Sequence, residues 1–290
     1  MTDQNVVVGV DGSVIAVRAL DRAADEAERR GAALHIVYAV PDRDEAGPVL
    51  ASAAARTRGR HPGLPVVASA VEGGVVETLF RESEKAALTV VGTRGLGGVT
   101  AVLAGSVSLR LAAHVHGPLL VVRYDLPCDQ DTPSVERGWR HIAGLPVLLG
   151  LESDADAEAA AFAFEEAERR GVELRVLHAA AHRHTAPEMP SPIPGTSPGQ
   201  RRRDQDDRAE EAVPRFGTGR LRDEHPGVLV DIRTVHTGPA RALVEATREA
   251  AVVVIGAHHR TGPLGRRLGP VAHTLLHRSH CPVVLVPSLG

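Results

Sequence analysis

A glycine-rich segment at residues 90–106, VVGTRGLGGVTAVLAGS, holds the groups of this sequence that are best suited to bind an anion. Gly92, Gly95 and Gly105 have no Cβ, so the backbone amides beside them can approach a charged oxygen closely. Ser106 stands where a helix is expected to begin. Its hydroxyl, the free amides of the first turn and the helix dipole would all favour a negatively charged ligand.

Two further charged residues belong to the same chemistry. Arg94 adds a cation inside the loop, and Asp11 follows the first expected strand, where a carboxylate could meet a ribose hydroxyl or a phosphate-bound metal. The segment is not a Walker loop, because no Gly-Lys-Ser/Thr follows, and GVDGS after the first strand lacks the spacing of the dinucleotide fingerprint. A lone glycine loop usually binds nothing, so the elements around it are needed to distinguish an anion-binding site from a simple turn.

Strands and helices alternate along the first half of the chain. NVVVGV is expected to be a buried strand, and Ser13 is expected to cap a helix over residues 14–30 that Gly31 ends. Four more strands are expected at ALHIVYAV, LPVVASAV, LTVVG and PLLVVR. This alternation predicts a doubly wound parallel sheet of order 3-2-1-4-5, in which the loops after the first and fourth strands meet at the ligand-binding edge.

The chain also repeats itself. AERRGAALHIVYAV begins at residue 27 and its match, AERRGVELRVLHAA, begins at residue 167. The later HPG elements and the segments after them are 164 residues apart, so the second half carries an insertion at about 182–214. The insertion is rich in proline, serine and charge, which is typical of a mobile surface loop.

Two tandem domains of one kind are therefore expected, 1–126 and 142–290, with a linker over 127–141. The last strands of the two halves, LLVVR and VVLVP, are apolar and would be costly as bare sheet edges. We expect these two strands to pair, so that the domains form an intrachain pseudo-dimer.

The composition narrows the function classes. The net charge is −3 with no basic excess, which argues against sequence-independent binding of nucleic acid. No apolar run approaches the ~18 residues that a membrane span needs, and the N-terminus lacks a signal-peptide pattern. Two cysteines do not make a disulfide framework. We therefore expect a cytoplasmic protein with no nucleic-acid or membrane partner.

Together with VVVGVDGS at the start and PLLVVR at the end, the spacing Gly92-x2-Gly95-x9-Gly105-Ser106 resembles that of the ATP-binding universal stress proteins. The resemblance covers nearly the whole chain as two tandem copies. It implies an α/β fold of two five-stranded, Rossmann-like domains of the adenine nucleotide alpha hydrolase type, and bound ATP with Mg²⁺. It also implies a role in the stress response, a homodimer, an unidentified protein partner, and at most slow ATP hydrolysis.

By position, the resemblance assigns parts of the nucleotide to three places along the first domain. Adenine falls at the end of the second strand, ribose beside the first and fourth strands, and the phosphates at the glycine loop. The assigned residues are Ala39 and Val40 for adenine, Gly9, Val91 and Gly92 for ribose, and Gly95, Gly105, Ser106 and Val107 for phosphate. Asp11 matches the family's aspartate, Val10 lies beside it, and Arg94 occupies a variable position.

The second half departs from this pattern at the equivalent loop. Gly256 and Gly269 are kept, but His259 replaces the second glycine and Pro270 replaces the serine. A histidine puts a Cβ and a ring where the backbone should approach a phosphate. A proline removes both a hydroxyl and an amide donor, although it suits a first helical position.

Glu152 stands where Asp11 stands in the first half. We favour a degenerate second site that binds no nucleotide of this kind. The alternative is an altered anionic ligand held by the side chains of His259, Arg260, Arg266 and Arg267.

Other residues could suggest metal or covalent chemistry. His273 and His277 share a helix face at a zinc-like i, i+4 spacing, and His280 and Cys281 follow closely. The matching first-half region is an ordinary passage from helix to strand, so we expect no metal site. No Ser-His-Asp order or paired carboxylate indicates a catalytic centre, so we expect no catalytic residue and no enzyme.

Two other function classes compete with ATP binding. One is a protein–protein scaffold of the same fold whose loops need no nucleotide. The other is an adenylating enzyme on a similar sheet, which should carry Ser-Gly-Gly-x-Asp-Ser or His-x-Gly-His, and neither occurs.

Overall fold

The computed structural model of the 290-residue chain describes residues 5–41, 43–93, 106–114, 116–123, 144–179, 217–235, 237–262 and 265–287. The expected linker and the expected insertion both lie outside these ranges. In the described ranges, no helix is both long enough and apolar enough to cross a membrane.

The first half alternates strands and helices as predicted. Its strands are β1 (Asn5–Gly9), β2 (Leu34–Val40), β3 (Val66–Glu72), β4 (Ala86–Gly92) and β5 (Leu119–Val122). Its helices are α1 (Val14–Arg30), the 3-10 turn η1 (Arg43–Ala46), α2 (Gly47–Arg60), α3 (Val75–Ser83) and α4 (Ser106–Ala112).

The second half repeats this plan, and its described residues include a hairpin. Its strands are β6 (Val147–Leu151), β7 (Leu174–Ala179), β8 (Val230–Val235), β9 (Val252–Ala257) and β12 (Val283–Pro287), with β10 (His259–Gly262) and β11 (Gly265–Leu268) forming the hairpin. Its helices and 3-10 turns are η2 (Asp154–Asp156), α6 (Ala157–Arg170), α8 (Pro239–Ala246), η3 (Thr247–Glu249) and α9 (Pro270–Arg278). Residues 217–224 are also helical.

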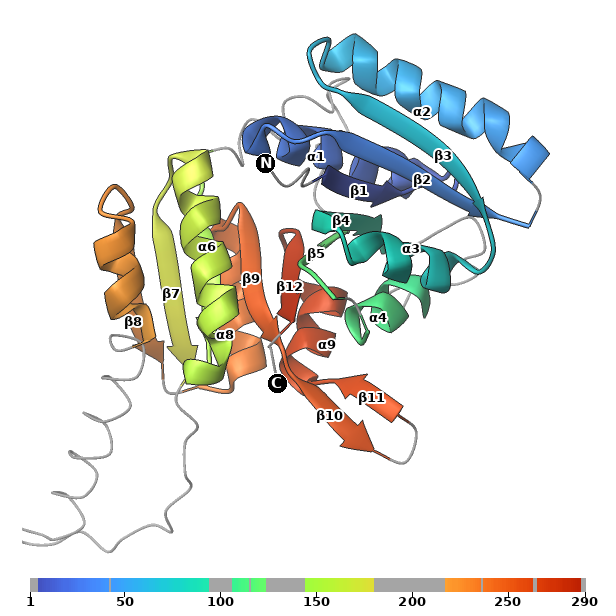
Figure 1. Cartoon of the computed structure of the whole chain (residues 1–290). Helices are drawn as coiled ribbons and strands as arrows, with labels where there is room; N and C mark the ends of the chain where they lie inside the picture. The colour runs from blue at the N-terminus through green and yellow to red at the C-terminus, as the bar shows by residue number, and fades with distance from the viewer. Residues whose placement is uncertain are drawn as a thin grey trace, which may run out of the picture.

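One ten-stranded sheet runs through both halves in the order β3-β2-β1-β4-β5-β12-β9-β6-β7-β8 (Figure 1). Each half has the predicted order 3-2-1-4-5, and the strands within each half are parallel. The halves join where β12 pairs antiparallel with β5, with Val283 opposite Val121 and Leu285 opposite Leu119. The predicted pairing of the two apolar last strands is therefore confirmed.

Helix α1 begins and ends where the sequence predicts. Ser13 has an extended backbone, and its Oγ accepts the amide of Ala16 at 3.2 Å, which satisfies one free donor of the first turn. Gly31 ends the helix in the left-handed region with φ of 59°, a conformation that favours glycine. Gly171 ends α6 in the same way, with φ of 62°.

Two hydrophobic cores lie on opposite faces of the sheet. Successive residues of β1 alternate between them, with Val6 and Val8 in one core and Val7 in the other. Helices α1, α2 and α6 cover the first core, and α3, α4, α8 and α9 cover the second. The cores are almost entirely aliphatic, as the aromatic content of 2% requires.

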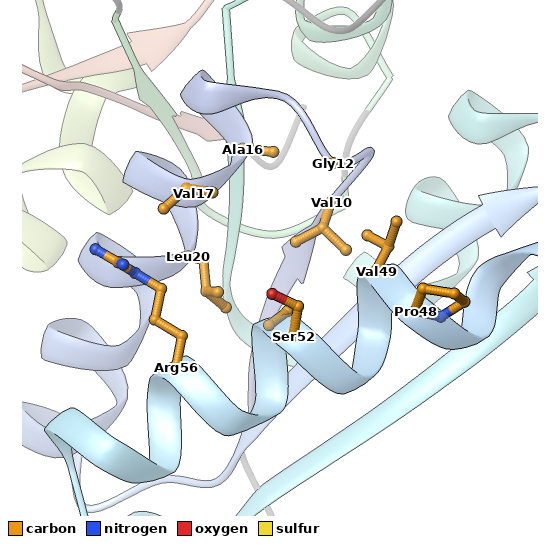
Figure 2. Close-up of a pocket in the computed structure, with 10 residues that line it drawn as sticks. Val10, Gly12, Ala16, Val17, Leu20, Pro48, Val49, Ser52 and Arg56 are labelled. Carbon is orange, nitrogen blue, oxygen red and sulfur yellow. The ribbon is translucent and has the colours of Figure 1, made fainter.

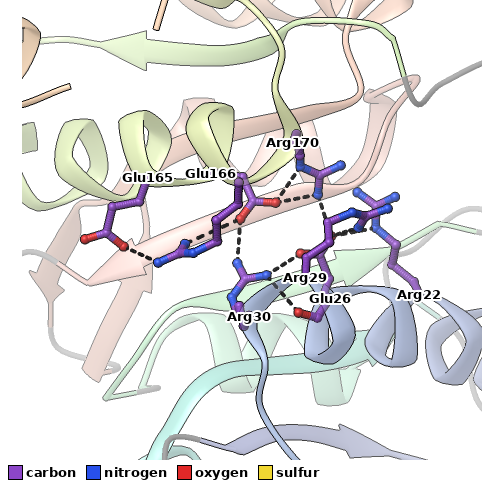
Figure 3. Close-up of polar contacts among 8 residues, drawn as sticks. Arg22, Glu26, Arg29, Arg30, Glu165, Glu166 and Arg170 are labelled. Atoms are coloured by element: carbon purple, nitrogen blue, oxygen red, sulfur yellow. Dashed lines mark hydrogen bonds and ion pairs between the residues drawn. The ribbon is translucent and has the colours of Figure 1, made fainter. Parts of the chain in front are cut away.

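A buried network of arginines and glutamates joins α1 to α6 across the two halves (Figure 3). Glu26 and Glu166 are 1% and 2% exposed, and each contacts both Arg30 and Arg170. Arg22 adds a further contact, with its Nε 3.1 Å from Glu26 Oε1. Each buried carboxylate therefore binds cations from both halves of the chain.

Candidate functional site

A pocket of about 130 Å³ opens at the carboxyl ends of β1, β2 and β4, at the edge where the strand order reverses. It brings together seven of the residues that the sequence singles out: Gly9, Val10, Asp11, Ala39, Val91, Gly92 and Val107. Val107 belongs to the first turn of α4, the helix that follows the glycine loop. Residues far apart in the sequence therefore meet at one place, as the predicted strand order requires.

Apolar side chains make most of the remaining wall. Val37 comes from β2, and Val75 and Leu79 come from α3. Tyr38 and Ala16 complete the lining. The result is a narrow apolar slot with one carboxylate at its rim.

Asp11 is held in place by the turn that starts α1. Its Oδ1 accepts the amide of Ser13 at 3.0 Å, and Ser13 in turn caps the helix. The side chain is only partly exposed. This arrangement fixes a negative charge beside the apolar slot.

Gly9 and Gly92 allow close packing at the floor of the pocket. A Cβ on Gly92 would lie 2.8 Å from Ile15 Cγ1, and a Cβ on Gly9 would lie 2.9 Å from Leu79 Cδ1. A Cβ at either position would therefore force the neighbouring side chain of α1 or α3 to shift. The sequence analysis places both glycines beside the expected ligand. The structure shows in addition that each glycine leaves room for a side chain of a neighbouring helix.

The structure does not place all the assigned residues at the pocket. Val40, 4% exposed, is not among the lining residues. It is adjacent to Ala39, and successive strand residues point to opposite faces, so Val40 lies on the α1 and α2 side of the sheet. Arg94, Gly95 and Gly105 lie outside the described residues, and only the backbone of Ser106, the first residue of α4, is described.

The equivalent loop of the second half contains the β10–β11 hairpin, which projects away from the sheet (Figure 1). His259 pairs with Leu268 at its base, and Gly262 pairs with Gly265 near its tip. Pro270 is the first residue of α9 and Gly269 precedes it, as expected for a proline at a first helical position. The hairpin was not predicted from the sequence.

The base of this hairpin is held by a partly buried ion pair. His258 Nε2 lies 2.7 Å from Oδ1 of Asp156, which is 2% exposed. Oδ2 of Asp156 accepts the amides of Glu152 and Ser153 at 2.7 and 3.2 Å. A Cβ on Gly256 would overlap Asp156 Oδ1. The space beside the glycine of the fourth strand is thus filled by the chain's own side chains.

The pair also alters the titration of the histidine. The hydrogen bond to Asp156 raises the pKa of His258 above its usual 6.5, and this effect outweighs partial burial, which acts in the opposite direction. Glu152, at the position of Asp11, is 80% exposed and lies 3.9 Å from the imidazole. In the second half, a partly buried Asp–His pair therefore lies beside the exposed carboxylate that takes the position of Asp11.

A second hollow of about 270 Å³ lies between α1 and α2 (Figure 2). Val10 and Ala16 line both this groove and the pocket, so a thin wall separates the two. Arg56 lies along its edge, and its guanidinium binds the carboxylate of Asp21 at 2.7 and 2.8 Å. No feature of the sequence indicated this groove.

The histidines of α9 form no metal site within the described part of the chain, where no group of three or more His, Cys, Asp or Glu side chains is placed to hold a metal ion. The rings of His273 and His277 pack against each other, with centroids 4.4 Å apart. Cys281 is buried, and burial raises the pKa of its thiol to about 12.

Comparison with known proteins identifies the family. The family model described as the universal stress protein family matches residues 3–123 and 145–287, most of the chain. The chain belongs to the universal stress protein family. The two matched segments correspond to the two halves of the sheet, so this universal stress protein carries two tandem domains of that family, which has a role in the stress response.

Relatives match this chain over nearly their full length. A universal stress protein of Mycolicibacterium smegmatis is 32% identical and covers 98% of this chain and 97% of its own. One from Mycobacterium tuberculosis is 29% identical, covering 98% and 95%. The crystal structure of a universal stress protein from Archaeoglobus fulgidus has a TM-score of 0.63 at 15% identity, covering 99% of this chain and all of that one, so the fold is shared across both domains.

Proposed function

We propose that this universal stress protein binds one ATP per chain, with Mg²⁺, in the pocket of the first domain. The observation that carries the proposal is the convergence of the strand ends and the start of α4 on that pocket. ATP would act in the stress response as a ligand that sets conformation or partner choice, since a ligand shifts a conformational equilibrium by binding one state better.

The lining suits the parts of an adenine nucleotide. Val37, Leu79 and Val91 offer apolar surface to a flat base, and Asp11 offers a carboxylate to the ribose hydroxyls. A volume of about 130 Å³ is below the roughly 300–1,000 Å³ of ordinary ligand sites, so these residues enclose only the base and part of the sugar. The triphosphate would extend toward the glycine loop, whose spacing carries the family resemblance.

The same lining argues for little or no turnover. Its titratable groups among the described residues are Asp11 and Tyr38. One oxygen of Asp11 already accepts a backbone amide, and no histidine or lysine faces the slot in the described lining. General acid–base catalysis needs a group of suitable pKa beside the reacting atoms. ATP would therefore be a bound regulator, and a kcat of about 1 per second or more would contradict this.

The second domain supports a stoichiometry of one. Asp156 and His258 occupy the space beside Gly256, and His178 turns its Nδ1 to the carbonyl of Leu151 at 2.9 Å, where Tyr38 lines the first pocket. A nucleotide there would have to displace this partly buried ion pair. The degenerate second site expected from the sequence is therefore part of this proposal.

Calorimetric titration of the full chain with Mg-ATP tests the proposal, using a pair of matched variants. Ala39→Arg should abolish binding, because it places a long charged side chain in the slot. Ala179→Arg makes the same change at the equivalent strand end of the second domain and should leave both affinity and a stoichiometry near one unchanged. Circular dichroism checks that each variant is folded.

Two results would overturn the proposal. One is binding by Ala39→Arg that equals the parent protein. The other is a parent protein that neither carries adenine nucleotide through purification nor binds it in the titration, which would favour the nucleotide-independent scaffold. Loss of binding in Ala179→Arg instead would assign the nucleotide to the second domain.

A further inference from the structure

A groove of about 750 Å³ lies between α8 and α9, on the side of the sheet that holds the second hydrophobic core. Three arginines, Arg241, Arg248 and Arg278, line it together with His280. Glu245 is the one acidic side chain among the described lining residues. The whole chain has a net charge of −3, so this gathering of guanidinium groups is a local feature of the surface.

Most of the positive charge in the groove has no counterpart within the described part of the chain. Arg241 and Arg278 are exposed, and neither forms an ion pair with a described residue. Arg248 Nε lies 3.3 Å from Glu245 Oε1, but the two side chains are 57% and 74% exposed, and such exposed contacts are weak. An anion could therefore bind all three guanidinium groups without breaking a buried contact.

Helix stability explains two of these arginines but not the third. Arg278 lies in the last turn of α9, and Arg248 lies in η3 directly after α8, where a cation meets the negative end of a helix dipole. Arg241 instead lies in the first turn of α8, at the positive end of the dipole, where a cation is unfavourable. A bound anion would offset this cost, because the guanidinium and the start of the helix both attract negative charge.

The first half builds the corresponding place differently. Phe80 matches Val244 and Glu77 matches Arg241, each at a separation of 164 residues. The ring of Phe80 packs on His116, with centroids 4.4 Å apart, whereas the smaller Val244 lines an open groove. Glu77 lies in the first turn of α3 and has the sign that the helix dipole favours. At this one place, the second half thus has space instead of a ring and a cation instead of a carboxylate.

We propose that the groove between α8 and α9 binds a short inorganic polyphosphate, an anion of two or more linked phosphate groups. Guanidinium groups bind phosphate oxygens through paired, charge-assisted hydrogen bonds. Arg241 and Arg248 are seven residues apart, about 10 Å along a helix, so the cations are spread along the groove. A chain of linked phosphates can contact all of them, whereas a single phosphate meets fewer.

The groove suits a short ligand without a base. Its volume of about 750 Å³ falls within the roughly 300–1,000 Å³ of ordinary small-molecule sites. Ala240 and Val244 are its apolar residues among the described lining, which is little surface for a flat base.

The surface beside the groove does not continue its positive charge. On α3 and the residues after it, which share this side of the sheet, the exposed charges alternate in sign. They are Glu77, Arg81, Glu84 and Lys85. A long polyanion would therefore find no continuous positive track along this face, which favours a short ligand.

His280 can report on binding from inside the groove. Burial lowers the pKa of its imidazole below the usual 6.5, and the charges of Arg248 and Arg123 lower it further, while Glu245 acts in the opposite direction. The backbone amide of His280 donates to Thr247 Oγ1 at 2.9 Å, which holds the residue at the groove. A polyphosphate beside the ring would add negative charge and raise the pKa of His280.

Calorimetric titration of the full chain with inorganic triphosphate, in the absence of magnesium, tests the proposal. We expect triphosphate to bind at least about tenfold more tightly than inorganic monophosphate or sulfate. Arg241→Gln with Arg278→Gln should weaken triphosphate binding at least about tenfold. Arg58→Gln with Arg60→Gln removes the same charge from exposed residues of α2, on the other side of the sheet, and should leave binding unchanged.

A second pair of variants tests the shape of the groove without changing its charge. Val244→Phe introduces the residue that the first half carries at this place, so it should fill the groove and abolish binding. Val244→Ala keeps the groove open and should retain binding. Circular dichroism checks that each variant is folded, and a nuclear magnetic resonance titration should show triphosphate raising the pKa of His280 in Val244→Ala but not in Val244→Phe.

Several results would overturn the proposal. Triphosphate that leaves the pKa of His280 unchanged in the parent chain would show that it binds elsewhere or not at all. Equal losses in the two arginine pairs, or monophosphate bound as tightly as triphosphate, would show only general attraction of anions. ATP that raises the pKa of His280 at lower concentration than triphosphate would overturn the assignment to a ligand without a base, and heparin that does so would show a polymer as the occupant.

The test is separate from that of the nucleotide pocket in the first domain. Ala39→Arg, which should abolish ATP binding there, leaves the groove intact and should bind triphosphate as the parent chain does. Loss of triphosphate binding in Ala39→Arg would place the triphosphate in the first domain and contradict the groove. Failure of the groove proposal therefore leaves the ATP proposal untouched.

Discussion

Replacing Glu26 by glutamine removes one of the two buried carboxylates that hold α1 to α6. Glu26 contacts four arginines: Arg22, Arg29, Arg30 and Arg170. Three of these, all but Arg29, are themselves at most 6% exposed. After the substitution, Glu166 is the remaining buried carboxylate in contact with Arg30 and Arg170.

The cost follows from the charge that is left behind. Removing one partner of a buried ion pair typically costs about 3–5 kcal/mol, because the other charge stays desolvated without compensation. Glutamine matches glutamate in size, so packing should change little. We expect Glu26→Gln to lower the free energy of unfolding by about 3–5 kcal/mol at neutral pH, a large share of the roughly 5–15 kcal/mol of a typical domain.

The pH dependence has a definite sign. Burial alone would raise the pKa of Glu26, but Arg170, Arg22, Arg30 and Arg29 together hold it well below its usual 4.5. A carboxylate whose pKa is lowered by folding stabilises the protein above its unfolded value, and this contribution is lost as the pH falls through the folded value. The difference between parent and variant should therefore be full at neutral pH and shrink only below about pH 4.5.

Urea unfolding followed by far-UV circular dichroism measures the effect, with Glu165→Gln as the control. Glu165 neighbours Glu166 but is 49% exposed, and its contact with Arg169 should be worth at most about 1 kcal/mol. Equal losses for Glu26→Gln and Glu165→Gln would refute the reasoning. So would a difference that grows, rather than shrinks, on acidification below pH 4.5.

Two further predictions concern the second domain. Asp156 stabilises the charged form of His258. The stability that Asp156→Asn removes should therefore be full below pH 6.5 and decline as the pH rises through the raised folded pKa of His258. A nuclear magnetic resonance titration of the imidazole checks this, and an unshifted pKa of His258 in the parent protein would contradict it. Cys281 should resist thiol reagents at pH 8 in the native state, because burial raises its pKa to about 12 and only the thiolate reacts. The rate of thiol labelling is measured in a Cys128→Ser background. Rapid labelling of the native protein would contradict the prediction by showing that the thiol is accessible.

The sequence could predict the sheet because its signals are local and periodic. Ser13 and Gly31 mark the ends of α1 by capping chemistry that operates within one turn. The order of the strands follows from alternation with helices, and the pairing of β5 with β12 follows from the cost of exposing two apolar edges. The pocket follows from that topology, since parallel strands bring their carboxyl ends to one edge.

The features that the sequence did not indicate depend on contacts between distant residues. Asp156 and His258 are 102 residues apart, and nothing near either one indicates that they pair. The Arg30–Glu166 contact spans 136 residues, and on α1 alone Glu26 and Arg30 look like an ordinary exposed i, i+4 pair. Only the packing of α1 against α6 shows that these charges are buried.

Val40, one of the two residues assigned to adenine, does not line the pocket, although the three residues before it in β2, Val37, Tyr38 and Ala39, all do. The alternation of side chains along a strand does not by itself decide which of its residues border a pocket. The hairpin in the second domain also went unpredicted, because no local pattern in its residues indicated it.

The carboxyl-end edges of the two half-sheets are linked mechanically by α1 and α6. The first turn of α1 borders the pocket through Ala16, and its last turn carries Arg30 of the buried network. The segment leading into α6 carries Asp156, which lies beside Gly256 of the second half. The last turn of α6 carries Arg170. A buried network of this kind fixes relative position more reliably than it adds net stability. It would therefore resist movement of α1 on nucleotide binding, so a conformational response to ATP should arise in α4, which begins at the pocket and belongs to the opposite core.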